Sequence, residues 1–312
     1  MIAHAHPVPP LPTRLAALAL GLGVQVGGCV DAVDGGDAER GASLGTGSPD
    51  ATTSSLEEAF VLPPERPHDP NPLDLPPAPM PEGLDVGRRI FTVPLEMLET
   101  LAPGRVLELR AAYYRGLGDG TMLVRVGHGP TYPIHPAYVV VPERRGRLGR
   151  GTRVIASYRG RLHHGVVSGR RARRILVQFT DLGTSLGLQR LDPERVGSLG
   201  PGLRPGGFAT RTTPEGLEHL TLVSAAVHPD GVRRWLTVGH HGTIDLVPET
   251  SLTSLPREGR PRLRPGDPVR VVWRGRMVPG TLRAWDRLGL YTVQRTRSGA
   301  PLVVGPGMIM PE

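Results

Sequence analysis

The only cysteine of the chain, Cys29, is the side chain best suited to covalent chemistry. A thiolate is a nucleophile that can be alkylated. Cys29 follows an apolar run, residues 15–24, which is preceded by Arg14. This run is too short to cross a hydrocarbon core, which needs about 20 apolar residues, so it predicts a secretory signal. The alternative is that Cys29 is a small buried side chain, but the residues after it are hydrophilic.

The residues that end at the cysteine, Val26-Gly27-Gly28-Cys29, resemble the lipobox of bacterial lipoproteins. The resemblance implies cleavage between Gly28 and Cys29 and a diacylglyceryl group on the Cys29 thiol. It also implies delivery to the outer rather than the inner membrane, because Val30 stands where inner-membrane members mainly carry Asp. Two or three acyl chains hold a protein at a membrane where one does not. A plain secretory signal and a misplaced start codon are the alternatives.

Arginine alone carries the basic charge, since the chain contains no lysine. Residues 1–100 hold 5 arginines and 14 acids, whereas residues 101–312 hold 32 arginines and 15 acids. Guanidinium groups pair bidentately with phosphate, so dense clusters predict a polyanion-binding surface. The alternative is a solvated surface in an arginine-rich protein. The clustered residues are Arg144, Arg145, Arg147, Arg170, Arg171, Arg173 and Arg174.

The histidines and carboxylates have no spacing that indicates a metal site or catalysis. His163-His164 and His240-His241 are adjacent pairs, and neighbours in a strand point to opposite faces, so each pair offers a site at most one ligand. The sequence contains no Gly-x-Ser-x-Gly, no phosphate loop and no His-x-x-x-His. We therefore expect no catalytic residue, no metal ligand and no cofactor.

Composition separates the chain into a signal peptide, a tether and a folded part. Residues 1–28 are the predicted signal peptide. Residues 29–95 are acidic and proline-rich, with nine prolines among residues 63–81, which predicts a disordered or polyproline tether. The 42 glycines and 34 prolines of the whole chain exclude long helices and favour short strands joined by turns.

The folded part contains an internal repeat. The phrase Leu-x-[Pro/Arg]-Gly begins at Leu101, Leu148, Leu203 and Leu263. Seven identities at a constant offset of 115 match the second occurrence to the fourth. This repetition predicts four modules, residues 96–146, 147–199, 200–259 and 260–312.

Each module is expected to consist of short strands. Gly160 and Gly165 are interpreted as bracketing a tight hairpin between the first two strands of the second module. A proline followed three residues later by an aliphatic residue, as in Pro193 and Val196, predicts one 3-10 turn before a closing strand. The fold class is therefore all-β. The strands predicted for the second module are residues 153–158, 165–168, 174–179 and 188–191.

The second module, from Gly151 through Tyr158 to Phe179 and Asp181, resembles Tudor/Agenet-type barrels, within the wider class of bacterial Src-homology-3-type domains. The resemblance implies tandem small β-barrels after a disordered linker. It also implies an aromatic pocket made by Tyr158, Phe179 and Asp181, with Trp273 as the equivalent of Tyr158 in the fourth module. Such pockets hold methylated Lys or Arg by cation–π contacts.

Two residues depart from the pattern of that family. Leu162 and His163 stand where it usually supplies aromatic side chains. This difference favours placing Tyr158 and Phe179 in a barrel core rather than in a complete pocket.

Together these features predict a monomeric, non-enzymatic lipoprotein of the cell envelope, anchored to the membrane through its N-terminal lipid. Its tandem barrels would bind or scaffold an envelope protein, a glycan or a polyanion through the arginine-rich surface. The alternative is a cytosolic Tudor-like protein that binds nucleic acid and has a fortuitous apolar N-terminus. A second alternative is an enzyme whose site lies between modules.

Overall fold

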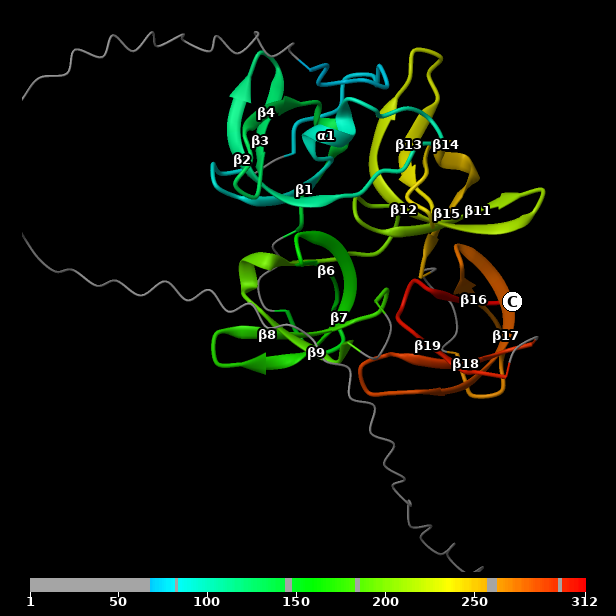
Figure 1. Ribbon diagram of the computed structural model, residues 1–312. Coiled ribbons are helices and arrows are strands. Elements are labelled where there is room, and N and C mark those ends of the chain that lie inside the picture. The colour runs from blue at the N-terminus through cyan, green and yellow to red at the C-terminus, as the bar shows by residue number, and fades with distance from the viewer. Residues whose placement is uncertain (1–67, 82–83, 144–147, 183–185, 257–262, 297–298) are drawn as a thin grey trace, which may run out of the picture. The chain divides into compact units, whose positions relative to one another are not determined.

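The computed structural model describes residues 68–81, 84–143, 148–182, 186–256, 263–296 and 299–312 (Figure 1). These residues form two ten-stranded antiparallel sheets, which confirms the all-β fold class. Within them α1 (Leu95–Leu98) is a helix of four residues. The predicted signal peptide, Gly28, Cys29 and the first part of the predicted tether lie outside the described residues.

The first sheet consists of two groups of five strands, and so does the second sheet. The first group contains β1 (Arg89–Thr92), β2 (Arg110–Gly118), β3 (Thr121–Val126), β4 (Thr131–Ile134) and β5 (Val139–Val140). The second group contains β6 (Arg153–Tyr158), β7 (Arg161–Arg171), β8 (Arg174–Phe179), β9 (Leu188–Leu191) and β10 (Val196–Ser198).

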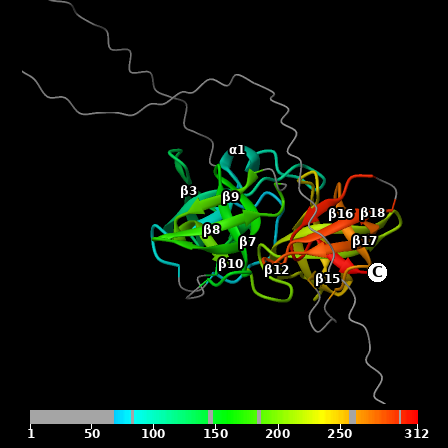
Figure 2. The same cartoon turned by 90° about the horizontal axis from the view of Figure 1, so that it is seen from below.

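The second sheet has the third and fourth groups. The third group contains β11 (Phe208–Thr213), β12 (Gly216–Val227), β13 (Arg233–Val238), β14 (Ile244–Pro248) and β15 (Leu252–Leu255). The fourth group contains β16 (Pro268–Trp273), β17 (Arg276–Trp285), β18 (Tyr291–Arg295), β19 (Leu302–Val304) and β20 (Ile309–Pro311). Figure 2 shows the strands of each sheet gathered together.

All four groups have the same order of strand pairing. The first four strands pair in sequence, and the fifth returns to pair with the first. A register shift interrupts the second strand of every group, for example between Val167 and Gly169 in β7 and between Leu282 and Ala284 in β17. Such a bulge bends a strand and increases its twist. The long second strand can therefore pair with two neighbours that curve away from each other.

The strands predicted for the second module are confirmed. Three of them match the observed bounds of β6, β8 and β9. The remaining one, residues 165–168, lies within the longer β7. Three of the predicted 3-10 turns are present, as η1 (Pro136–Tyr138), η3 (Pro193–Arg195) and η4 (Glu249–Ser251), each directly before the closing strand of its group. Proline fixes the backbone angle at the first position of η1 and η3. The turn expected at Pro306 is not 3-10, because Gly307 has a positive φ of 92°.

The interpretation of Gly165 is wrong. The hairpin between β6 and β7 turns at Arg159 and Gly160, both at positive φ (48° and 78°), as a two-residue type I′ turn requires. Gly165 lies inside β7, where a Cβ atom would be 2.6 Å from the carbonyl oxygen of Gln178. Gly280 has the same role in β17, because its Cβ would be 2.8 Å from the carbonyl oxygen of Gln294. Close strand packing therefore explains this pair of matching glycines.

The start of the first repeat is also corrected. In the second, third and fourth groups the glycine of the repeated phrase donates its N–H to the second strand, as in Gly151 to Val167 O (2.7 Å). In the first group the residue that does so is Gly87, which donates to Tyr114 O (2.7 Å), and not Gly104. The first group therefore opens at Leu84–Gly87, before the predicted boundary at residue 96.

The phrase at Leu101 belongs to the connection between β1 and β2, residues 93–109, which crosses to the third group. Gly104 N donates to Ile244 O (3.2 Å), and Leu107 N donates to Gly242 O (2.6 Å). The other three groups have tight hairpins at this place. An insertion in the first hairpin therefore places a similar phrase where no module begins.

The last part of the predicted tether is folded, so the tether prediction is wrong for residues 68–95 wherever the structure describes them. Leu75 is buried, and its backbone N–H and C=O both bond to the side chain of Asn71. The Tyr138 hydroxyl accepts the Leu73 N–H (3.1 Å). Ile90 and Phe91 of β1 are buried in the core of the first group, which also includes Ile244 of β14.

The two groups of each sheet are joined in the same way. Ala111 N of β2 donates to Gly160 O (2.6 Å), and His219 N of β12 donates to Gly275 O (2.9 Å). Gly160 and Gly275 are both the second residue of a hairpin turn and are 115 residues apart. The second and fourth groups therefore hold equivalent places in the two sheets, and so do the first and third.

Candidate functional site

A cavity of about 610 Å³ lies where residues of all four groups meet, and we call it the central cleft. The first group contributes Leu107, Glu108 and Leu109, from the connection before β2. The second contributes residues of β7 and Asp181, and the third contributes Phe208, His219 and the turn around His240. The fourth contributes Trp273, Arg274 and Met308. A volume of this size is typical of small-molecule sites.

Two histidines and a phenylalanine are in ring contact in this cleft. The ring of Phe208 contacts those of His164 and His219 at tilted angles, with centroid separations of 3.9 and 4.5 Å. His164 Nε2 lies 2.7 Å from Gly206 O, and His219 Nε2 lies 3.0 Å from Gly307 O. Carbonyl oxygens only accept, so Nε2 carries a proton in both rings. Each histidine thereby links its own group to the next one along the chain.

His219 is neutral at this position. Burial lowers the pKa of His219 to about 4, against the opposing effect of its hydrogen bond to Gly307, and nearby His164 and His240 lower it further. A neutral ring can stack on Phe208 without the cost of burying a charge.

The two carboxylates of the cleft are both satisfied by partners. Asp181 accepts the backbone N–H of His164 (2.9 Å) and a ring N–H of His163 (3.3 Å). Burial raises the pKa of Asp181, but its bonds to the two histidines outweigh that effect and bring it down to about 2. Glu108 forms ion pairs with Arg161 (2.7 Å) and Arg110 (3.3 Å). Neither carboxylate is therefore available as an unpartnered acid.

Trp273 and Arg274 form the edge of the cleft on the fourth group. Trp273 is 36% exposed, and the guanidinium carbons of Arg274 and Arg295 lie 5.6 and 3.7 Å from its ring centroid. Arg274 and Gly275 make the turn between β16 and β17 at φ 48° and 75°. A Cβ atom on Gly275 would lie 2.1 Å from His240 Cβ, so the turn packs directly on the third group.

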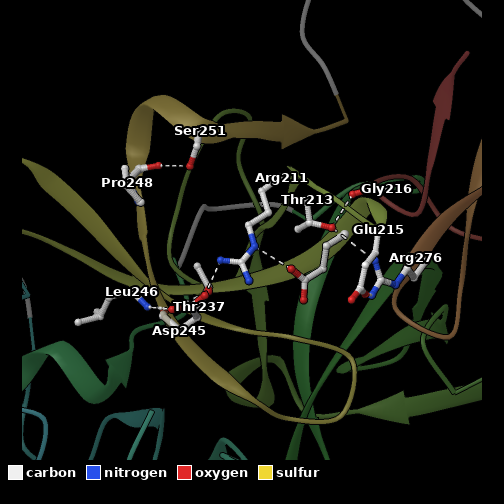
Figure 3. Close-up of polar contacts among 11 residues, drawn as sticks. Arg211, Thr213, Glu215, Gly216, Thr237, Asp245, Leu246, Pro248, Ser251 and Arg276 are labelled. Atoms are coloured by element: carbon white, nitrogen blue, oxygen red, sulfur yellow. Dashed lines mark hydrogen bonds and ion pairs between the residues drawn. The ribbon is translucent and has the colours of Figure 1, made fainter. Parts of the chain in front are cut away.

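Ion pairs fix the base of this turn (Figure 3). Arg276, the first residue of β17, pairs with Glu215 in the turn between β11 and β12. Arg211 of β11 bonds to Glu218 of β12 (2.7 Å) and pairs with Asp245 of β14. Glu218 is in turn the sheet partner of Arg276. The network therefore holds the third group to the hairpin that presents Arg274.

The predicted aromatic pocket is only partly assembled. Tyr158 and Phe179 are in contact, with centroids 5.3 Å apart, and His163 lies 6.2 and 5.7 Å from them. Phe179 is 1% exposed and belongs to the core of the second group, on which Tyr158 packs. Asp181 bonds to His163 beside them. Trp273 belongs to the fourth group and lines the central cleft, so it is not part of this cluster.

Four of the predicted polyanion-binding arginines lie together on the hairpin between β7 and β8, which we call the arginine hairpin. Arg170, Arg171, Arg173 and Arg174 are all exposed. Arg174 pairs with Asp192 (3.5 Å), and the other three have no ion pair among the described residues. Arg144, Arg145 and Arg147 lie outside the described residues.

Sequence reasoning missed Phe208, His219 and Arg274. One signal was present: His164 and His219 are 55 residues apart, which is also the offset between the repeated phrases at Leu148 and Leu203. This register places the two histidines at equivalent points of β7 and β12. Arg274 matches Arg159 at the offset of 115, but that match does not distinguish an arginine beside a cavity from one without a cavity. Phe208 had no comparable signal, because packing between groups gives it its place.

Within the parts of the chain that the structure describes, no three His, Cys, Asp or Glu side chains are grouped so as to hold a metal ion. The same residues include no helix of the length and apolarity that a membrane span needs. No family model and no curated protein matches the sequence. The arginine hairpin and the central cleft are therefore the features from which a function can be argued.

Proposed function

We propose that this chain is a lipid-anchored cell-envelope protein that binds a polyanion without catalysis, through the arginine hairpin. One observation carries the binding proposal. Arg171 and Arg174 are direct cross-strand partners on either side of the turn at Ala172 and Arg173. Like charges directly opposite each other destabilise a hairpin, and of the two only Arg174 has a carboxylate partner among the described residues, Asp192 at 3.5 Å. An anion between the two guanidinium groups would relieve the repulsion and bind bidentately.

Each strand group is proposed to be a small barrel of the Tudor or Src-homology-3 type. The return of the fifth strand to the first, the bulge in the second strand and the 3-10 turn before the last strand all support this proposal. Four such units on one chain favour a binding or scaffolding protein over an enzyme, because each unit alone is small and the arginine hairpin is a surface feature.

The membrane anchor is tested by cell fractionation of the full-length protein and its Cys29→Ala variant. We expect the wild-type protein in the membrane fraction and the variant released from it. If both fractionate as soluble cytosol, the lipoprotein proposal fails and the nucleic-acid-binding alternative gains support.

The polyanion site is tested on a heparin column with the full-length protein. An Arg170→Gln/Arg171→Gln variant is expected to elute at lower salt, because each lost anion contact reduces the salt dependence of binding. Arg283→Gln/Arg287→Gln is the control, since it removes the same charge from exposed residues of the fourth group. Equal elution of the two variants would show that only net charge matters and would overturn the arginine hairpin as the site.

A further inference from the structure

We propose that the central cleft is a second binding site, separate from the arginine hairpin, and that its ligand is an amphiphilic anion: an apolar chain or ring system that ends in one acidic group. The proposal does not depend on the polyanion site. It rests on the lining of the cleft, on the state of its charged groups and on the position of Arg274.

Apolar atoms make up most of the surface that lines the cleft. Phe208, Val272, Met308 and Trp273 come from the third and fourth groups, and Leu109 comes from the first. Burial of apolar ligand surface against such a lining contributes about 25 cal/mol per Å². A strongly hydrated ion such as inorganic phosphate would gain nothing from these residues. The body of the ligand must therefore be apolar.

The charged groups of the cleft favour an anion over a cation. Glu108 and Asp181 are each already paired, with Arg161 and with His163 and His164. Arg274 is exposed and has no carboxylate partner among the described residues. Burial, His241 and Arg274 itself lower the pKa of His240, so that ring adds hydrogen-bonding capacity rather than charge. The free charge of the cleft is therefore a guanidinium beside Trp273.

Arg274 is also held where a ligand can reach it. Its backbone is fixed in the left-handed region by the hairpin turn, and Gly275 anchors that turn against His240. The equivalent residue of the second group, Arg159, has the same φ of 48° and lies over Tyr158 (5.5 Å), but it does not line the cleft. Arg159 is therefore a control for Arg274: it has the same position in its hairpin turn but does not line a cavity.

The test is a fluorescence titration of the full-length protein with 1-anilinonaphthalene-8-sulfonate, an aromatic anion, at neutral pH. Arg274→Gln is expected to weaken binding about fivefold, as for loss of one partly exposed charge pair. Arg159→Gln is expected to bind as the wild type does. Leu182→Glu places a negative charge at the rim of the cleft and should also weaken binding. Its control, Leu188→Glu, changes another exposed leucine that does not line the cleft.

Competition with the dye identifies the acidic group that the cleft prefers in its ligand. Dodecanoate or dodecyl phosphate, kept below micelle formation, should displace the dye, and the stronger competitor indicates a carboxylate or a phosphate headgroup. Uncharged dodecyl maltoside and inorganic phosphate should displace it weakly or not at all. The proposal is overturned if Arg274→Gln and Leu182→Glu both bind the dye like the wild type, or if inorganic phosphate competes as well as dodecyl phosphate. Because the arginine hairpin is intact in these variants, their heparin elution reports the polyanion site independently.

Discussion

His219 of β12 and Gly307 of the turn before β20 are joined by a hydrogen bond of 3.0 Å, through which a neutral histidine ring links the third group to the fourth. The ring is buried against Phe208, so its protonation would place a charge in an apolar site. The two groups are therefore coupled by a side chain that titrates.

The first prediction concerns acid stability. The pKa of His219 is about 4 in the folded chain and 6.5 when unfolded. Between these values the unfolded state binds the extra proton, so stability is fully present above about pH 6.5 and falls as the pH drops. The loss between pH 7 and pH 5 should be about 2 kcal/mol. His219→Gln should remove this part of the pH dependence in urea unfolding, because glutamine does not titrate, while its amide can still donate to Gly307 O.

The control for this prediction is His128→Gln, which changes an exposed histidine of the first group. That variant should keep the wild-type pH profile. If His219→Gln also keeps it, the neutral buried state of His219 is wrong.

The second prediction concerns Asp181, whose pKa is lowered from 3.8 to about 2 through its bonds to His163 and His164. A carboxyl with a lowered pKa stabilises the fold above about pH 4 and loses that effect as the pH falls to 2. Asp181→Asn should cost about 1–2 kcal/mol in the free energy of unfolding at pH 7. It should also flatten the stability profile between pH 4 and pH 2. Glu99→Gln changes an exposed acid and should do neither.

The strands and turns of the second group were predictable because their signals are local. Arg153–Tyr158 and Arg174–Phe179 are β-prone runs between turn residues, and Pro193 marks its 3-10 turn. The opening of the first group at Gly87 was missed because the insertion between β1 and β2 contains a competing phrase at Leu101. Local patterns do not reveal which of two similar phrases precedes a buried strand.

The central cleft could not be predicted from any one segment. Glu108, His164, Phe208 and Trp273 come from four different groups, and only the packing of those groups brings them together. Trp273 was selected from the sequence as the equivalent of Tyr158, and the repeat register does make them equivalent. Their surroundings differ, however, since Tyr158 packs on the core of its own group and Trp273 faces a cavity.

The third prediction uses the two glycines inside second strands. Gly165 and Gly280 have no Cβ, and one added there would lie within 2.8 Å of a backbone carbonyl oxygen on the neighbouring strand. Each substitution to alanine should lower the free energy of unfolding by about 2 kcal/mol, because the strands must separate to admit the methyl group. Gly169→Ala is the control on the same strand, since nothing lies within 4 Å of its Cβ position. Equal costs at Gly165 and Gly169 would refute the role of close strand packing.

The fourth prediction separates backbone strain from contact between groups, using the paired turn residues Gly160 and Gly275. Both have φ near 77°, so alanine at either position should cost about 1 kcal/mol for the left-handed backbone alone. Nothing lies within 4 Å of a Cβ at Gly160, whereas one at Gly275 would overlap His240 Cβ. Gly275→Ala should therefore cost about 1–3 kcal/mol more than Gly160→Ala in chemical denaturation.

A double-mutant cycle identifies the source of the extra cost. The overlap at Gly275 involves the Cβ of His240, so only glycine at position 240 removes it, and His240→Ala does not. Gly275→Ala combined with His240→Gly should recover most of the extra destabilisation, while the combination with His240→Ala should recover little. If both combinations behave alike, the hairpin that presents Arg274 does not pack on His240 as described, and the edge of the central cleft is not fixed by that contact.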